Sequence, residues 1–581
     1  MDPKLKLIVR GNPREELSLL LRLHKANIYP KNCKVISQFG DVISCRILRK
    51  NLLSVYDDKA TRSLKAPQVI PANYKNSRIT DVSIGAFQEL HQNLVSSNYK
   101  RSPVVFGIID FGFDFGHRDF QDAYGKTRFE KIWVQPTPYR NSNKYGYGEI
   151  FNAPEMNRAI TSQSPYRFLG YHPGKNDRFG RGMHGTHVLG IAASSGASGA
   201  RGLASTSPIV AVDMGSSYVN GSDLSLGDSV KLIEGIDFIL EQAGERPCVI
   251  NLSLGGHCSD HTGKTLVEIA LNNAVKNRKA TVIVQSTGNY FKADCHHVGI
   301  LKEGESKEIT WLFKRRDPSA NEIEVWYEGE DRITAELYTD NGILIGRSEP
   351  FNDAVLNYDK IQNGIIYHRS KEPNTGKNHI NIILSKRPES RKLILKLKGG
   401  QVKNGEYHVY VERDDMGQSR LAPQDVDTNF TIGSICNAPL TIAVGAYNQK
   451  SLERDPMSFS SAGPTIDRRV KPEVLAPGNK IVAARSASKY QLEPGHGLIA
   501  KSGSSMAAPY VASLAVKILE KFPKLSIYEI RRLLFQSCNA RKHRNQSDAN
   551  QSGYGMVSYA KLRFLLKQKQ RSQQSKNRLH Y

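Results

Sequence analysis

The chain has 581 residues, of which 39% are hydrophobic and 24% are charged, and this balance is typical of globular proteins that fold in water. One ordinary hydrophobic core does not organise a chain of this length, so we expect two to four domains. The sequence contains no apolar run near the roughly 20 residues that span a bilayer, and its start lacks the apolar segment of a signal peptide. We therefore expect a cytoplasmic protein with no membrane partner.

The seven cysteines are scattered and form no C-x-x-C pair. This pattern excludes a zinc ribbon and favours a reducing compartment over a disulfide framework. The formal net charge of +25 would attract acidic partners, but the basic residues are spread along the chain without a known nucleic-acid-binding motif. We expect a solvated surface and no specific nucleic-acid partner. Binding of nucleic acid through the basic surface stays open as an alternative, which binding at raised salt would test.

The N-terminal segment predicts a small α+β domain over residues 1–75. Periodicity favours a strand, a helix, two strands about a glycine and a second helix, at residues 4–11, 15–27, 33–48 and 50–58. Residues 66–78 contain two prolines and many polar residues, and they are interpreted as a linker.

From residue 104 onward, apolar β-branched runs alternate with helix-length segments. The runs occupy residues 104–110, 207–214, 248–255, 280–287 and 439–446. Near-continuous apolar strands of this kind are typical of a parallel sheet that is covered on both faces. The sequence therefore predicts an α/β domain in two parts, residues 76–295 and 425–566, which ends in helical patterns at 507–522 and 526–537.

Residues 296–424 interrupt this alternation. Six segments with strand periodicity follow one another without helices, at 307–314, 322–329, 332–339, 379–386, 392–399 and 405–413. Turn residues separate them, so we predict an inserted antiparallel, jelly-roll-like sandwich. The tail, residues 567–581, is basic and rich in glutamine, and it is predicted to be disordered.

Two histidines three residues apart, His184 and His187, lie where a glycine-rich loop becomes an apolar helix. An isolated H-x-x-H pair more often marks packed or hydrogen-bonded side chains than a metal site, because zinc requires further His, Cys or carboxylate ligands. The H-E-x-x-H pattern of zinc helices is also absent. Taken alone, the pair favours a structural role, and no metal site is predicted.

Asp110 directly follows the first core strand, and open α/β sheets place their sites at that end of the strands. An aspartate there can equally cap a helix or a turn. Ser505 precedes a proline by four positions, and because proline is tolerated only in the first turn of a helix, Ser505 should lie at a helix N-terminus. The ordinary interpretation is an N-cap, but this position also favours developing negative charge.

The order Asp, His, Ser along the chain is that of the acyl-transfer triad of subtilisin. Six segments resemble motifs of the subtilisin-like serine proteases, the subtilase family, at residues 104–120, 180–194, 248–256, 282–289, 459–478 and 502–512. The resemblance covers residues 80–295 and 425–565, and it implies a subtilisin-like, doubly wound and mostly parallel sheet. Within the family the chain is most similar to the clostridial germination (Csp-type) subtilases, which carry a jelly-roll domain before the serine motif.

The resemblance also implies a role for each matching residue. Asp110 would orient the imidazole, His184 would act as general base and then general acid, and Ser505 would be the nucleophile. Asn289 would donate to the oxyanion. The residues implied to pair with the substrate backbone are Ser253, Leu254, Gly255 and Gly256. His187 falls inside the following helix and is expected to be structural, and no cofactor is implied.

Residues 1–75 resemble the family's prodomain, which chaperones folding and whose C-terminal end occupies the active-site cleft. We expect this region to act as an intramolecular inhibitor or chaperone, with self-cleavage between about Pro71 and Ser83, whereas a permanently attached domain is the alternative. The predicted function is a serine endopeptidase that acts on polypeptides through an acyl-enzyme. The alternative is a catalytically silent protein of the same fold that binds or regulates through its cleft.

Overall fold

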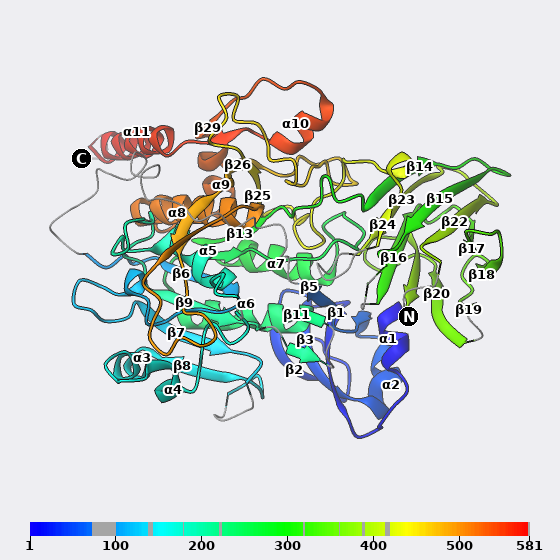
Figure 1. Ribbon diagram of the computed structural model, residues 1–581, viewed down its shortest axis with the longest axis horizontal. Helices are drawn as coiled ribbons and strands as arrows, with labels where there is room; N and C mark the ends of the chain where they lie inside the picture. Colours follow the sequence, from blue (N-terminus) through cyan, green and yellow to red (C-terminus); the bar gives the residue numbers. More distant parts are fainter. Residues whose placement is uncertain are drawn as a thin grey trace.

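The computed structural model describes residues 1–71, 100–137, 143–177, 179–215, 217–219, 223–315, 317, 320–358, 361–385, 390–412 and 419–578. The predicted cleavage segment beyond Pro71 therefore lies outside the described residues. In Figure 1 the α/β part of the chain lies on the left, the antiparallel sandwich on the right, and the N-terminal unit, in dark blue, below and against both.

A ten-stranded sheet forms the centre of the α/β part. Its order is β29-β30-β26-β25-β13-β12-β6-β9-β7-β8, and all neighbours are parallel except those of the edge strands β8 and β29. Its strands are β6 (Val105–Asp110), β7 (Phe129–Val134), β8 (Glu149–Asn152), β9 (Ile209–Asp213), β12 (Cys248–Leu252), β13 (Thr281–Ser286), β25 (Ile442–Tyr447), β26 (Val474–Pro477), β29 (Cys538–Asn539) and β30 (Met556–Val557). The five predicted core strands are β6, β9, β12, β13 and β25. The expected doubly wound, mostly parallel sheet is thus confirmed.

Helices cover both faces of this sheet. On one face, α5 (His184–Ala193) packs against α8 (Ser504–Lys521), and α8 crosses the central strands. On the other face, α6 (Ser229–Ala243) and α7 (Leu266–Asn277) pack against each other and carry the N-terminal sheet. The remaining helices are α3 (Ala153–Ile160), α4 (Pro165–Leu169), α9 (Ile527–Gln536), α10 (Gln546–Ser552) and α11 (Tyr559–Arg578). The two predicted C-terminal helices are α8 and α9.

The sandwich consists of a six-stranded sheet, β14-β23-β16-β21-β20-β19, and a five-stranded sheet, β18-β17-β22-β15-β24. Its strands are β14 (His296–Ile300), β15 (Ser306–Leu312), β16 (Asn321–Tyr327), β17 (Ile333–Thr339), β18 (Leu344–Ser348), β19 (Ala354–Tyr358), β20 (Ile361–Arg369), β21 (Asn378–Leu384), β22 (Lys392–Gly399), β23 (Glu406–Val411) and β24 (Arg420–Leu421). The chain alternates between the two sheets from β14 to β17 and again from β21 to β24, whereas β17–β18 and β19–β20–β21 are consecutive neighbours within one sheet. The six predicted strands are present, and their buried aliphatic side chains form a separate core.

The N-terminal unit corrects two predictions. The predicted strand at residues 4–11 is instead helix α1 (Pro3–Ile8), which the Asp2 side chain caps by accepting from the N–H of Leu5 over 3.3 Å. The predicted helix at 15–27 is instead strand β1 (Glu16–Leu23), inside the sheet β2-β3-β1-β4. The other elements are β2 (Lys34–Phe39), β3 (Val42–Leu48), α2 (Leu52–Tyr56) and β4 (Thr61–Lys65). Leucines on both faces of β1 are buried, and this removes the alternation that marks a one-sided strand.

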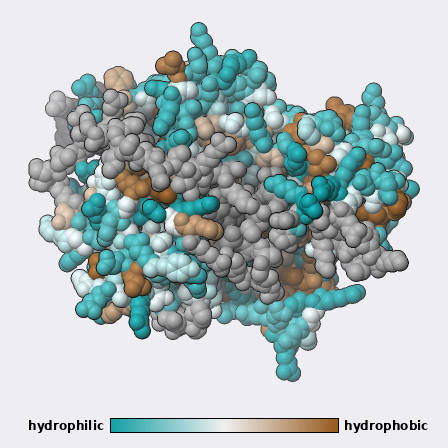
Figure 2. Space-filling view, viewed as in Figure 1, coloured by the Kyte–Doolittle hydropathy of each residue, from teal (hydrophilic) through white to brown (hydrophobic). Residues whose placement is uncertain are grey.

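The expected linker and tail also differ from the prediction. Part of the linker forms β5 (Val69–Pro71), which pairs antiparallel with β11 (Asp223–Asp228), while β11 also pairs with β10 (Ser217–Val219). The predicted disordered tail continues helix α11 as far as Arg578, because Leu562 and Leu566 bury its first turns. None of the described helices is long and apolar enough to cross a membrane. On the face shown in Figure 2, apolar residues occur in separate groups among hydrophilic ones.

Candidate active site

Asp110 and His184 meet at the carboxyl edge of the ten-stranded sheet. Asp110 is the last residue of β6 and His184 is the first residue of α5. Nδ1 of His184 lies 2.7 Å from Oδ1 and 2.9 Å from Oδ2 of Asp110, and its ring stacks on Phe111 with the centroids 5.4 Å apart. The side chain of Asp110 is 1% exposed and that of His184 is 13% exposed. A buried carboxylate thus fixes the orientation of a partly exposed imidazole.

Two glycines allow helix α5 to approach the Asp110 loop this closely. The N–H of Gly185 donates to the carbonyl oxygen of Phe111 over 2.9 Å, and a Cβ at Gly185 would lie only 2.7 Å from that oxygen. Gly112 has a φ of +71°, and a Cβ there would lie 2.5 Å from Cβ of Met183. Gly185 is required by the close contact, and Gly112 is required by both its close contact and its positive φ.

Buried polar groups hold the loop that precedes His184. The carboxylate of Asp177 accepts from the N–H of Arg181 over 2.8 Å and from that of Gly182 over 2.7 Å. Nζ of Lys501, at the end of β28 (Leu498–Lys501), donates to the carbonyl of Gly182 over 2.5 Å. Burial lowers the pKa of Lys501 to about 8. The loop is therefore fixed to the segment that leads into the Ser505 helix.

His187 lies one turn into α5 and is fully buried. Its Nε2 is 3.0 Å from the carbonyl oxygens of both Ile481 and Ile499, on the antiparallel strands β27 (Ile481–Ala484) and β28. Burial, reinforced by the nearby Lys501 ammonium, lowers the pKa of His187 well below its usual value. The second histidine is thus a neutral packing residue that fastens α5 to this hairpin.

Ser505 and Asn289 come together at the N-terminus of α8. The amide Oδ1 of Asn289 accepts from the N–H of Ser504 over 3.1 Å and from Oγ of Ser504 over 3.0 Å. These two bonds fix the amide of Asn289 and leave its Nδ2 donor without a partner within the described residues. Oγ of Ser505 also has no hydrogen-bond partner there. The N–H of Ser505 belongs to the first helical turn, where N–H groups have no intrahelical partner. Three polar groups are therefore available around Ser505.

The segment after β12, residues 253–256, runs beside the same serine. Oγ of Ser253 donates to the carbonyl oxygen of Ser505 over 3.1 Å. The backbone N–H and C=O of Leu254 form no hydrogen bond in the described part of the chain, so this edge can accept an added strand. Behind it, the N–H of Ser434 donates to the carbonyl of Gly256 over 2.9 Å, and Oη of Tyr290 donates to that of Gly255 over 3.3 Å. The segment is thus held by Ser434 and Tyr290, while the peptide groups of Leu254 keep their hydrogen-bonding capacity.

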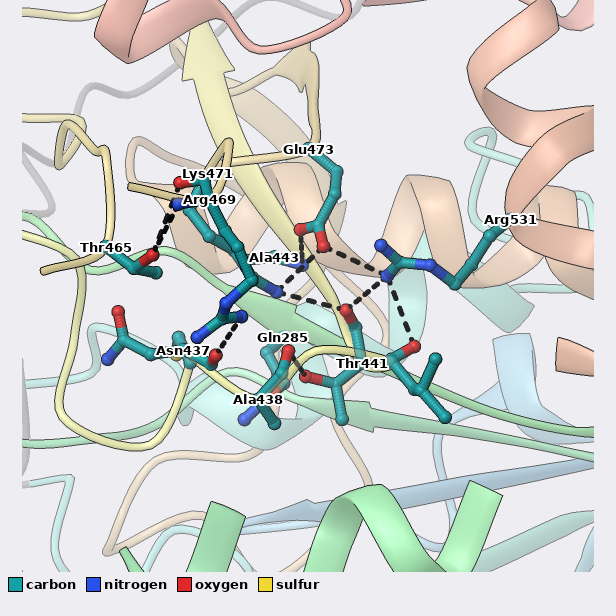
Figure 3. Close-up of polar contacts among 12 residues, drawn as sticks. Gln285, Asn437, Ala438, Thr441, Ala443, Thr465, Arg469, Lys471, Glu473 and Arg531 are labelled. Carbon is teal, nitrogen blue, oxygen red and sulfur yellow. Dashed lines mark hydrogen bonds and ion pairs between the residues drawn. The ribbon is translucent and has the colours of Figure 1, made fainter. Parts of the chain in front are cut away.

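A buried ion cluster anchors the strands below α8 (Figure 3). Nζ of Lys471 lies 2.8 Å from Oε1 of Glu473 and donates to the carbonyl of Thr441 over 3.1 Å. The guanidinium of Arg531, from α9, lies 2.9 Å from the same carboxylate oxygen. Glu473 also accepts from the N–H of Ala443 in β25 over 2.8 Å. Because α8 packs on β25 and β26, the cluster fixes the support of the Ser505 helix.

Comparison with known proteins places the chain in a family. A sequence model of the Subtilase family matches residues 101–307 and 416–556, which is more than half of the chain. The chain belongs to the subtilase family. This subtilase is 36% identical to the serine protease AprX of Bacillus subtilis (strain 168) over 138 residues, which are 22% of the chain and 30% of AprX. It is 32% identical to subtilisin DY of Bacillus licheniformis over 128 residues, 22% of the chain and 39% of the relative.

The chain thus spans less than half the length of these curated relatives. The structure of the Clostridium perfringens CspB protease has the same fold, with a TM-score of 0.68 and 22% identity, over 81% of this subtilase and 94% of CspB. The resemblance to Csp-type subtilases inferred from sequence is confirmed for the fold.

Sequence reasoning missed one buried acid of this subtilase, Asp213. It ends β9 and lies beside Asp110 in register, and burial raises its pKa to about 6. The signal that selected Asp110, an aspartate directly after a buried parallel strand, is equally present at Asp213. The family motifs do not include that strand, and for this reason the second aspartate received no role.

Proposed function

We propose that this chain is a serine endopeptidase in which Asp110, His184 and Ser505 act together. The observation that carries the proposal is the paired and buried Asp110–His184 contact at the N-terminus of α5, a helix that packs on the one whose first turn carries Ser505. Catalytic hydrogen bonds are often long in substrate-free enzymes and tighten with substrate. The contact between His184 and Ser505 belongs to the proposal, since no hydrogen bond joins these two residues in the described part of the chain.

The reaction proceeds in two steps. Nε2 of His184 takes the proton of the Ser505 hydroxyl while Oγ attacks the scissile carbonyl, and the resulting imidazolium, paired with Asp110, gives the proton to the leaving amine. Water then attacks the acyl-enzyme by the same route, which releases the carboxylic acid and restores Ser505. Asp110 stays ionised throughout and holds the ring in the required tautomer.

Negative charge develops on the carbonyl oxygen during acylation, and hydrogen-bond donors must already be in place to stabilise it. Asn289 Nδ2 and the N–H of Ser505 are proposed to supply them, because both are without a partner among the described residues and both lie at the positive end of α8. The Oδ1 bonds to Ser504 support this role, since they aim the amide without using its donor. Preorganised donors of this kind lower the barrier because they need not reorient during the reaction.

The N-terminal unit is proposed to act as the intramolecular inhibitor and chaperone. Its sheet packs on α6 and α7, and a buried ion pair between Arg46 and Glu234, 2.8 Å apart, lies in that interface. The N–H of Ser229 donates to the carbonyl of Gln68 over 2.9 Å, and β5 extends the β10–β11 hairpin as a third strand. These contacts hold the N-terminal unit and β5 on the catalytic part of the chain, which supports an intramolecular role. Self-cleavage between about Pro71 and Ser83 remains part of the proposal.

Peptide-library profiling tests the proposal directly. The protein should hydrolyse internal peptide bonds, and Ser505→Ala should abolish hydrolysis while its melting temperature stays unchanged. Intact mass tests self-processing separately, because wild type should lose its N-terminal unit from the covalent chain and Ser505→Ala should not. Absence of hydrolysis by a folded wild type that is freed of its N-terminal unit would favour the catalytically silent alternative.

A further inference from the structure

Asp213 forms a buried link between the Asp110 loop and helix α5. Its Oδ2 accepts from the N–H of Gly112 over 3.1 Å and from Oη of Tyr171 over 2.6 Å, and its Oδ1 accepts from the N–H of Gly215 over 2.8 Å. Gly112 in turn accepts through its carbonyl from Oγ1 of Thr186 over 2.7 Å. Gly112 therefore connects Asp213, through its N–H, to the helix that begins at His184, through its carbonyl.

Asp213 also lies next to the charges of the proposed active site. It is the neighbour of Asp110 across strands β6 and β9, and the N–H of Met214 donates to the carbonyl of Asp110 over 2.9 Å. The Asp110 carboxylate adds to burial in raising the pKa of Asp213 to about 6. Asp213 thus places a second carboxylate beside the one that pairs with His184, and negative charge near an imidazole generally favours the imidazolium.

A surface pocket of about 490 Å³ opens onto these groups. Its lining includes Asp213, Tyr171 and Phe111, the residue whose ring stacks on His184. The other titratable groups of the pocket are His172 and Lys175, from the segment after α4, and β7 contributes only the apolar Val134. The region around Asp213 can therefore exchange protons with solvent although the residue is only 4% exposed.

We propose that Asp213 is a positioning residue whose negative charge and hydrogen bonds hold His184 ready for catalysis, and that protonation of Asp213 switches activity off in mildly acidic solution. This inference rests on the proposed protease function. The carboxylate accepts from three donors, so an added proton weakens or replaces one of these hydrogen bonds, or reverses the one with the Tyr171 hydroxyl. The affected groups include the Gly112 N–H, which fixes the loop of Asp110, and the lost charge no longer favours the imidazolium formed during acylation.

Two variants separate charge from packing. Asp213→Asn removes the charge at nearly constant volume, and Tyr171→Phe removes one donor while the charge is kept. In wild type, the acid limb of kcat/KM should fall with a slope approaching two per pH unit, because Asp213 and His184 both take up a proton. Asp213→Asn is neutral like the protonated carboxyl, so its kcat/KM should be low at every pH. Its remaining acid limb should have a slope of one, with the midpoint lower by roughly half to one pH unit. In Tyr171→Phe the Asp213 step should instead move to higher pH, since a hydrogen bond to its charged form is lost.

A readout without turnover keeps this inference distinct from the protease proposal. In a Ser505→Ala background, proton NMR of the His184 Nδ1–H should show its titration midpoint lowered by Asp213→Asn. The wild-type resonance should also carry a second inflection near pH 6 that Tyr171→Phe shifts upward. Identical His184 titrations in wild type and both variants would overturn the role of Asp213, whether or not the protein hydrolyses peptides. If Asp213→Asn does not fold, the inflection in Tyr171→Phe decides alone.

Discussion

Replacement of Arg46 by methionine should release the N-terminal unit from the catalytic part of the chain. Arg46 is 7% exposed and Glu234 is fully buried, and the guanidinium donates to both carboxylate oxygens of Glu234 over 2.8 and 3.0 Å. In the variant, the Glu234 carboxylate keeps only the hydroxyls of Ser44 and Tyr147, at 2.8 and 2.9 Å. Breaking a buried pair at one partner costs about 3–5 kcal/mol, so the affinity of the interface should fall by roughly 100- to 4,000-fold.

The measurement uses the full chain with Ser505→Ala and a recognition site for a specific protease placed after Pro71. After cutting, dissociation of the N-terminal fragment is followed by size-exclusion chromatography over a dilution series. Arg10→Met is the matched control, since Arg10 is exposed and removal of its charge leaves the buried pair intact. Equal retention of the fragment in the Arg46→Met and Arg10→Met proteins would refute the reasoning.

Three further predictions concern single side chains. His184→Ala should abolish hydrolysis at unchanged stability. His187→Ala should instead lower the free energy of unfolding by about 2–4 kcal/mol, because it leaves a cavity and two unpaired carbonyls. Equal loss of turnover at unchanged stability in both variants would contradict the assignment. Glu473→Gln should lower the free energy of unfolding, measured in urea, by about 3–5 kcal/mol, because Lys471 is left buried without its counter-charge. A loss smaller than about 1 kcal/mol would contradict the stabilising role of the ion cluster. Because the pKa of Asp213 is raised to about 6, the native state holds a proton there between pH 4 and 6 that the unfolded chain releases. This group should therefore destabilise the fold by about 3 kcal/mol as pH rises through that window, and Asp213→Asn should flatten the corresponding part of the stability profile; a profile parallel to wild type would contradict this.

The α/β core was predictable because its strands are buried on both faces and its proposed catalytic residues sit at strand ends and helix starts. Those positions can be recognised from neighbouring residues in the sequence, such as the glycines around His184 and the proline after Ser505. The role of Asn289 followed from a motif, whereas its two bonds to Ser504 depend on a contact between segments more than 200 positions apart. Asp213 carries the same strand-end signal as Asp110, but no family motif covers it, and its partners Gly112, Tyr171 and Gly215 lie on separate loops.

The N-terminal unit was harder to predict because burial there does not follow one period. In β1, Leu19 and Leu21 face the core of the N-terminal unit while Leu20 joins the core of the α/β part. Because β1 is buried on one face by its own domain and on the other by the α/β part, its sequence lacks the alternation of a one-sided strand. The sandwich strands that went unpredicted, such as β18 and β19, are short and partly exposed, and their pairing is decided by neighbouring strands rather than by their own sequence.

Labelling with a fluorophosphonate tests the central claim most directly, because this reagent reacts with a serine only when a base activates it and donors stabilise the charged adduct. On folded protein freed of its N-terminal unit, mass spectrometry should find a single phosphonyl group, carried by the peptide that contains Ser505. Labelling should be lost in Ser505→Ala and in His184→Ala and retained in His187→Ala at a temperature where that variant is folded. A folded, unlabelled wild type, or labelling that survives His184→Ala unchanged, would contradict the account.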